Sequence, residues 1–429
     1  MHLGGFTLRD IRDKALPMTQ VLDMPLPDSR ASEQKLVLGV CFAHFVSHYY
    51  ITLLAPLFVF IKEDYAVSYT DLGLALTAFN VASTVLQTPT GFLVDRVNAR
   101  LVIIAGLLLG AAAIAIAGLI NSYWVFVAMF AVAGIGNTVY HPADYTLLAR
   151  HVPPERAGRV FSYHTFSGMI GNAAAPATLV LMYGLVGWRG AFLGAAALGV
   201  VAAFALLFVR DPAPHESALP EQSAGACKDK ADGPEPNAWQ LLTAPPILLN
   251  LVFFILLSFC GGGLSNYLVA ALGALHGTPL DIANASLTAL LIMGAAGVLV
   301  GGMLTGVTSR HGLVASCGLT ATATVCVLVG LVDFNAIALI LLMSAAGFCS
   351  GITMPSRDMI VRKVTPPGAF GRVFGFVSTG FNIAGIVSPL IFGQLLDHGY
   401  VREMFFFMAV CALLAIGTIG LSTSAKKAG

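Results

Sequence analysis

The sequence predicts an all-α integral membrane protein with twelve transmembrane helices in two pseudo-symmetric six-helix bundles and both termini in the cytoplasm. Three observations predict this fold class: an apolar composition, apolar runs at regular intervals and an internal repeat. Of the 429 residues, 57% are hydrophobic and 10% are charged, and the mean hydropathy is +0.82. A soluble protein of this length would carry more charge, because its surface must face water.

Apolar runs of about 20 residues, the length that crosses a bilayer, follow one another along the chain. Short polar or proline-bearing stretches separate them. The twelve expected spans are residues 35–60, 70–94, 99–120, 122–148, 159–184, 188–209, 246–273, 281–306, 312–332, 336–362, 371–396 and 402–422.

The second half of the chain repeats the first at a constant offset of 213 residues. The stretch from Gly134 to Phe161 aligns without a gap with the stretch from Gly347 to Phe374. The clearest match is Gly-Arg-Val-Phe, which ends both stretches. A repeat of this length between long apolar runs indicates a duplicated membrane bundle.

The distribution of basic residues predicts the orientation. With the N-terminus placed inside, 20 of the 23 Lys and Arg residues fall on the inner side, and only Lys62, Arg189 and Arg402 fall outside. By the positive-inside rule both termini are then cytoplasmic. Residues 1–34 lack an apolar core and are expected to be a cytoplasmic lead-in and not a cleavable signal. The expected parts are the lead-in 1–34, an N-terminal bundle 35–209, a cytoplasmic linker 210–245, a C-terminal bundle 246–422 and a tail 423–429.

Polar side chains inside the first-half spans mark a candidate pathway. These residues are His44, His48, Asn137, His141, Asp144 and His164. The first two lie four residues apart, on one helical face, and the next three recur at intervals of four and three, along one face of the fourth span. Imidazoles at such positions can simply hydrogen-bond neighbouring helices. Polar groups in a span normally face the bundle interior or a water-filled cavity, which favours the pathway interpretation.

The second half places its polar groups at partly equivalent positions. The candidates are Asn266, Tyr267, Arg357, Asp358 and Asn382. Under the repeat, Arg357 aligns with Asp144. Each lies nine residues before a Pro-Pro pair, hence about 13 Å inward from the cytoplasmic boundary. A lone charge at this depth is costly, so a partner or a cavity is expected.

The loop after the second span carries a further motif. It reads Gly91-Phe-Leu-Val-Asp95-Arg96-Val-Asn-Ala-Arg100 and resembles the signature loop of the major facilitator superfamily. The resemblance implies the twelve-helix fold of that family and a central cavity lined by the first, fourth, seventh and tenth helices. It also implies that Asp95 lies near the start of the eleventh helix, around Gly371. A carboxylate is favoured at a helix N-terminus, so this contact would hold the inner gate closed.

Two hypotheses follow for the pathway. Asp144 and Arg357 are expected to face each other across the halves, paired in one state and separated in another. His44, His48, His141 and Asp144 are the candidates for carrying a proton, since imidazole titrates in the physiological range. With several histidines and Arg357 in the cavity, an anionic or zwitterionic small-molecule substrate is favoured.

The His-Pro-Ala-Asp element in the fourth span, with His44 in the first, resembles the fosmidomycin-resistance-like branch of the superfamily. We therefore expect proton-coupled efflux of a small organic anion or drug-like compound by alternating access. The alternative is proton-coupled uptake of a carboxylate or other small anionic nutrient, which the same scaffold supports. The expected location is the inner membrane of a bacterium, as a multi-pass monomer embedded in lipid.

Other classes of protein fit the sequence less well. No nucleotide-binding Gly-x-x-x-x-Gly-Lys-[Ser/Thr] motif occurs, so transport would draw on an ion or substrate gradient. The seven cysteines are scattered without a Cys-x-x-Cys motif, and we expect no metal site and no cofactor. An enzyme would need a nucleophile with a base in register, and a receptor would more naturally carry a soluble domain. Nucleic acid is not an expected partner.

Overall fold

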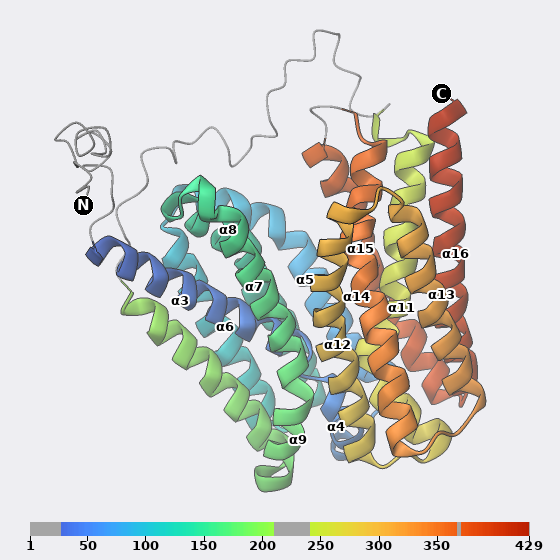
Figure 1. The fold of residues 1–429 in the computed structure, drawn as a ribbon. Coiled ribbons are helices and arrows are strands. Elements are labelled where there is room, and N and C mark those ends of the chain that lie inside the picture. The colour runs from blue at the N-terminus through green and yellow to red at the C-terminus, as the bar shows by residue number, and fades with distance from the viewer. Residues whose placement is uncertain (1–26, 210–240, 367–369, 429) are drawn as a thin grey trace, which may run out of the picture.

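A computed structural model describes residues 27–209, 241–366 and 370–428, and this part of the chain is helical without strands (Figure 1). The elements are α3 (Pro27–Ile51), η1 (Ala55–Leu57), α4 (Phe58–Tyr65), α5 (Tyr69–Arg96), α6 (Ala99–Leu119), α7 (Tyr123–Asn137), α8 (Tyr140–His151), α9 (Pro154–Leu207), α11 (Pro245–His276), α12 (Leu280–Val307), α13 (His311–Leu331), α14 (Ala336–Val364), α15 (Phe370–Asp397) and α16 (Val401–Ala428).

Ten segments of the described chain are long and apolar enough to cross a membrane. One of them, Arg159–Leu207, contains 49 residues, and the backbone of Gly187 leaves helical geometry within it (φ 71°, ψ 176°). Glycine adopts this conformation without the steric penalty that other residues meet. The two arms of α9 therefore run in opposite directions (Figure 1), where the sequence predicts separate spans at 159–184 and 188–209.

The first predicted span, 35–60, is not one continuous helix. Helix α3 ends at Ile51, and the 3-10 turn η1 follows before α4 begins at Phe58. Pro56 lies in this turn and has no N–H with which to continue a helical ladder. The candidate span Arg30–Tyr65 therefore covers the predicted span 35–60, with a break in its helix at this turn.

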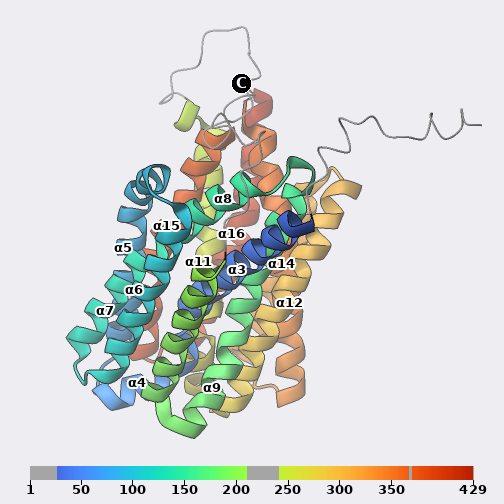
Figure 2. The ribbon, with the colours of Figure 1, turned by 90° about the vertical axis from the view of Figure 1, so that its left-hand side faces the viewer.

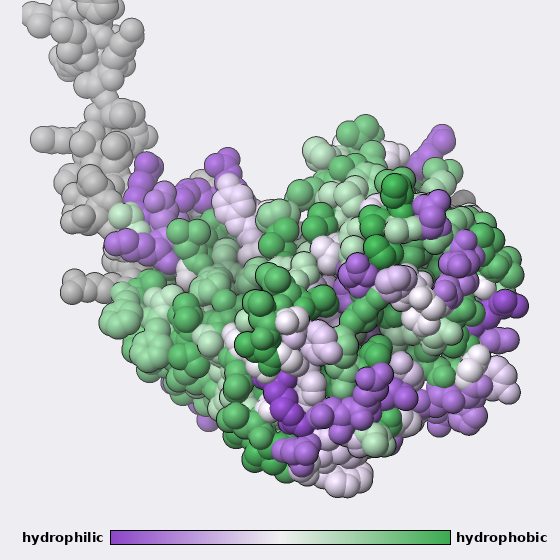
Figure 3. Space-filling model, turned by 90° about the horizontal axis from the view of Figure 1, so that it is seen from below, coloured by the Kyte–Doolittle hydropathy of each residue, from purple (hydrophilic) through white to green (hydrophobic). Residues whose placement is uncertain are grey.

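Apolar side chains cover much of the outside of the bundle. Leu185, Phe208 and Val307 expose 75%, 80% and 84% of their surface. So large an exposed apolar surface is unfavourable in water and matches contact with lipid tails. Seen from below, hydrophilic residues gather on the end of the molecule, with hydrophobic residues on its flanks (Figure 3).

The two halves of the chain, α3 to α9 and α11 to α16, stand side by side (Figure 1). They touch mainly through α5 against α15 and α9 against α12. Glycine allows the first pair to approach closely, since a Cβ at Gly73 would lie 2.5 Å from the carbonyl oxygen of Pro389. Thr77 also donates a hydrogen bond to the carbonyl of Ile386 across this contact (2.9 Å).

A carboxylate joins the halves where α15 ends and α5 begins. Asp397, the last residue of α15, accepts hydrogen bonds from the backbone N–H groups of Tyr69 (2.7 Å) and Thr70 (2.8 Å) and from the Thr70 hydroxyl (2.6 Å). These N–H groups begin α5 and have no partner inside that helix. The positive end of the helix dipole favours the negative charge, so Asp397 stabilises the closed contact at this end.

Within the first half, α3 packs along α9 (Figure 2). The close approach needs glycine at position 171, where a Cβ would clash with the Phe45 carbonyl oxygen. This contact brings the histidines of α3 against the first arm of α9, and it positions the polar site described next.

Candidate functional site

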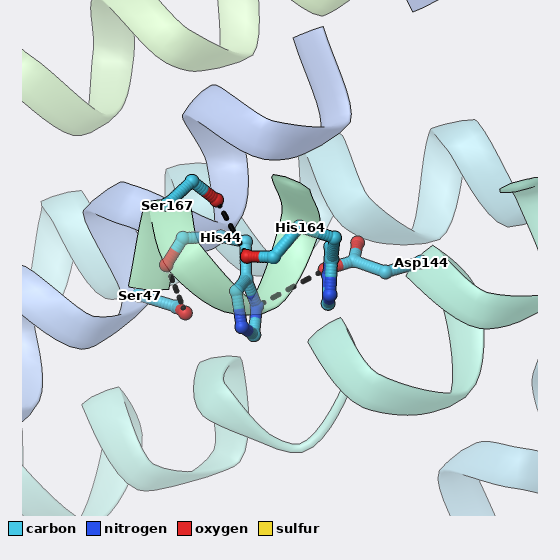
Figure 4. A network of polar contacts seen from close by, with 5 residues as sticks. All are labelled: His44, Ser47, Asp144, His164 and Ser167. Atoms are coloured by element: carbon cyan, nitrogen blue, oxygen red, sulfur yellow. Dashed lines mark hydrogen bonds and ion pairs between the residues drawn. The ribbon is translucent and has the colours of Figure 1, made fainter. Parts of the chain in front are cut away.

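A fully buried cluster of two histidines and one carboxylate lies inside the first half. The Asp144 carboxylate is 0% exposed, with His164 Nε2 at 2.8 Å and His44 Nδ1 at 3.3 Å from the same Oδ2 atom. The two imidazole rings stack with centroids 3.7 Å apart. Figure 4 shows both rings beside the carboxylate, with His44 held by α3, Asp144 by α8 and His164 by α9.

Two more histidines surround this cluster. The ring of His48 lies 4.6 Å from that of His44, and the ring of His141 lies 5.4 Å from it, centroid to centroid. Among the described residues, three atoms of the cluster are buried without a hydrogen-bond partner: His44 Nδ1, Asp144 Oδ1 and His164 Nδ1. Buried polar atoms are normally paired, so this cluster retains capacity for another proton or ligand.

The local backbone explains how these side chains meet. Pro142 has no N–H for the carbonyl of Thr138, and α7 gives way to α8 at that point. The interruption lies between Asn137 and Asp144, inside the stripe that the sequence predicts. On α9, a Cβ at Gly168 would lie 2.7 Å from His48 Cδ2 and 2.8 Å from His44 Cδ2. The glycine therefore makes room for both imidazoles.

A separate cavity of about 400 Å³ lies between the two halves. Its lining comes from both, mostly as apolar, glycine and uncharged polar residues. The polar members are Tyr50, Thr52, Asn80, Asn172, Ser258, Ser265, Asn266, Ser350, Arg357 and Ser388. Of the sequence-predicted residues, Asn266 and Arg357 thus line this cavity.

Arg357 is the charged group of the cavity lining. Its guanidinium lies beside a pair of packed aromatic rings, 4.9 Å from the ring centroid of Phe254 and 5.1 Å from that of Phe381. The two ring centroids are themselves 4.8 Å apart. The Arg357 Nε donates to Asp358 Oδ1 at 2.8 Å. The Arg357 side chain is 11% exposed and the Asp358 side chain 43%. Cation–π attraction to the two rings and the bond to Asp358 hold the guanidinium in place.

One residue joins the cavity to the buried cluster. Asn172 lines the cavity, its amide nitrogen lies 3.0 Å from His48 Nδ1, and its Oδ1 accepts a hydrogen bond from Thr52 at 2.9 Å. Asn172 lies within the predicted span 159–184 but is not among the predicted pathway residues. Its spacing of eight residues from His164, two turns along one helical face, is the signal that could have included it.

The expected pairing of Asp144 with Arg357 is not present in this structure. Asp144 binds His44 and His164 inside the first half, and Arg357 binds Asp358 within the second. The physical reason is that α8 turns the carboxylate toward α3 and α9, away from the cavity that Arg357 lines. The two charges occupy equivalent repeat positions without facing each other.

The remaining predicted pathway residues have other surroundings. Tyr267 is buried and donates to the Pro389 carbonyl at 2.6 Å, so it braces α11 against α15. Asn137 and Asn382 are half-buried and lie outside the cavity lining. His141 is an exposed residue, and its ring packs edge-on against the ring of His44 in the cluster.

The predicted gating motif is described only in part. Gly91 lies near the end of α5 with open space around it, and Arg96 is exposed. Arg100 donates to the Val209 carbonyl, which ties the start of α6 to the end of α9 within the first half. The Asp95 side chain and its expected contact near Gly371 lie outside the described residues.

The buried cluster also has the composition of a metal site. One ligand atom each from His44, Asp144 and His164 lie within 4.8 Å of one another, and two imidazoles with a carboxylate suit several divalent metals. The direct contact of 2.8 Å between His164 and Asp144 equally fits a shared proton. The expectation of no metal stays a prediction.

The comparisons with known proteins define the class. The family model of the Major Facilitator Superfamily matches residues 40–333 and 275–427. The chain therefore belongs to this superfamily of transporters and is a multi-pass integral membrane protein and not an enzyme.

Among its relatives is a probable sulfoacetate transporter of Cupriavidus necator, 26% identical over 423 residues, covering 91% of this chain and 93% of the relative. The fosmidomycin resistance protein of Escherichia coli strain K12 is 22% identical over 400 residues, covering 91% and 94%. A solved bacterial homologue of the human lysosomal transporter Spinster, inward-facing and occupied, has a TM-score of 0.72 at 15% identity, covering 94% and 98%. The last likeness concerns the fold.

Proposed function

We propose that this protein moves a small organic anion across the membrane by alternating access, as a secondary active transporter. The observation that carries the proposal is the cavity between the two halves, which both halves line and in which Arg357 supplies the charge. Two bundles that rock about such a cavity expose it to one side of the membrane at a time. The relatives include a probable transporter of a small anion, sulfoacetate, which supports this substrate class.

The membrane arrangement is part of the proposal. The ten candidate segments become twelve spans when the two arms of α9 are counted separately and α5 is added, which gives two bundles of six helices. Both termini are then cytoplasmic by the positive-inside rule. The protein then works as a monomer in the inner membrane of a bacterium.

We further propose that transport is coupled to protons through the buried cluster. Asp144, held between His44 and His164, has two imidazoles with which to share a proton. His48 and Asn172 connect this cluster to the cavity wall. Protonation there would neutralise a buried charge, and a change of this size in a low-dielectric site biases one packing of the bundle over another.

The direction of transport has two candidates. Efflux is supported by the similarity to a protein named for fosmidomycin resistance. Uptake of a carboxylate or similar nutrient is supported by the similarity to a probable sulfoacetate transporter. The same cavity serves both.

Flux in proteoliposomes tests the proposal. Candidate anions are first screened by thermal shift on the purified protein, because a ligand that binds the folded form raises its apparent stability. Radiolabelled hits are then loaded into vesicles, and flux is measured with and without an imposed pH gradient. We expect the pH gradient to accelerate anion flux. A protonophore, which dissipates the gradient, should return the flux to the rate measured without a gradient. Equal flux in protein-free vesicles would overturn the proposal, and flux indifferent to the gradient would overturn the coupling.

A further inference from the structure

The chemistry of the cavity wall defines which kind of anion fits, and this inference rests on the proposed anion transport. In the part of the chain that the structure describes, the cavity has one charged lining residue, Arg357, and a mostly apolar surface. Leu76, Phe79 and Phe130 line it from the first half, and Leu257 and Leu290 from the second. A pocket of 300–1,000 Å³ with few polar groups is typical of sites for organic ligands.

Arg357 defines where the charge of the ligand binds. The ring pair Phe254 and Phe381 attracts the guanidinium from one side, and Asp358 accepts the hydrogen bond of its Nε. Among the described residues no other hydrogen bond to this guanidinium is found, which leaves its terminal N–H groups for a ligand. A guanidinium pairs best with a planar or pyramidal oxyanion through two N–H donors.

The charge balance favours a single negative charge on the ligand. Asp358 already offsets part of the Arg357 charge, and among the described residues no lysine, histidine or second arginine lines the cavity. A dianion would bring an uncompensated charge into a largely apolar space, which is costly.

Several polar side chains of the wall already make hydrogen bonds within their own helices. Ser265 donates to the Gly261 carbonyl at 2.6 Å, and Asn266 to the Gly262 carbonyl at 3.1 Å. Asn80 likewise donates to the Leu76 carbonyl at 2.8 Å. Because these donors are engaged, a sugar acid would find fewer hydrogen-bond partners there than it has in water.

We infer that the substrate is an amphiphilic organic monoanion, whose oxyanion head binds Arg357 and whose apolar body packs on the leucine and phenylalanine walls. Carboxylates and sulfonates share the head chemistry. Polyhydroxylated acids and dianions should bind more weakly, and this includes sulfoacetate, the substrate in the name of one relative.

Binding of five probes to the full-length protein in detergent tests the inference. These are 3-phenylpropionate, 2-phenylethanesulfonate, the neutral 3-phenylpropionamide, gluconate and sulfoacetate. We expect the carboxylate, the sulfonate or both to bind at least about tenfold more tightly than the other three. The amide lacks the charge that pairs with Arg357, and gluconate and sulfoacetate lack an apolar body to pack on the walls. Binding to Arg357→Gln should weaken by the same factor, while Arg362→Gln, an exposed arginine of the same helix, should bind as the wild type.

The outcomes separate this inference from the proposed function. Tight binding of gluconate or sulfoacetate, with flux in proteoliposomes, would leave anion transport standing and overturn the amphiphilic class. Failure of both phenyl anions to bind, equal binding of the amide, or unchanged binding to folded Arg357→Gln would also overturn it. Transport of only neutral or cationic compounds would remove the proposed anion transport as well.

Discussion

The two halves of this chain keep their charged groups in opposite surroundings. In the first half, Asp144 is fully buried behind α3 and α9 and touches imidazoles. In the second, Arg357 occupies the equivalent repeat position but lines the central cavity beside two aromatic rings. A duplicated scaffold has therefore diverged at matching positions. In the function proposed above, one half holds a proton and the other an anion, and five variants test this division.

The largest effect is expected from Asp144→Asn. An amide cannot carry the shared proton, so gradient-driven flux should fall by about 100-fold or more, the usual cost of losing a proton-transfer group. Anion binding by thermal shift should change little, because Asp144 lies outside the cavity. The control is Asp281→Asn, an exposed acid in the first turn of α12. A large loss of binding in Asp144→Asn would contradict the separation of the two sites.

Exchanging the two charges tests the same separation directly. The double variant Asp144→Arg with Arg357→Asp should transport no better than either single variant, since residues without a shared partner act independently. Flux is measured in vesicles containing equal amounts of folded protein. Recovery of gradient-driven flux in the double variant would show that the two residues pair during the cycle.

The comparison also shows what the sequence can predict. The apolar runs and the repeat predict a bundle in two related halves, and the signature loop at Gly91 predicts the family. His44, Asp144 and His164 were found because ionisable groups inside apolar spans are rare. The bundle and the ionisable groups follow from composition and periodicity, which the sequence displays directly, whereas the family follows from the resemblance of the loop.

What could not be predicted depends on helix rotation and on contacts between distant segments. The repeat shows that Asp144 and Arg357 are equivalent, but it does not show that α8 turns the first away from the cavity. The bond of Asn172 to His48 spans 124 residues, and no periodicity reveals it. Pro56 and Pro142 signal interruptions, yet the sequence alone does not show whether a proline bends a span or ends a helix.

Gly168→Ala is expected to disturb the first half without touching the second. The added methyl would lie under 3 Å from the rings of His44 and His48, and overpacking of this kind costs about 1–3 kcal/mol. We expect a lower melting temperature and slower gradient-driven flux. Gly184→Ala is the matched control on α9, because nothing lies within 4 Å of that position. Equal behaviour of the two variants would mean that the imidazoles do not need the space.

Asn172→Ala tests the connection between the buried histidine cluster and the cavity. Loss of its hydrogen bonds to His48 and Thr52 leaves both groups without that partner, which costs about 1–3 kcal/mol. Gradient-driven accumulation should fall while exchange of labelled for unlabelled anion, which needs no net proton movement, stays near wild type. Thr178→Val removes a comparable α3–α9 hydrogen bond, to Tyr49, and should leave both rates unchanged. Parallel loss of both rates in Asn172→Ala would assign it to the substrate site only.

The smallest effect is expected at the end of the molecule, where Asp397 joins α15 to the start of α5. Removing a helix-capping side chain costs about 1 kcal/mol, so Asp397→Ala should favour opening at this end roughly fivefold. Labelling of a cysteine introduced at Ser258, inside the cavity, by a thiol reagent added from that side should accelerate accordingly, in a background without the native cysteines. Asp333→Ala, an exposed acid after α13, is the control. Unchanged labelling of Asp397→Ala would mean that the glycine-mediated packing of α5 on α15 holds this end closed without the carboxylate.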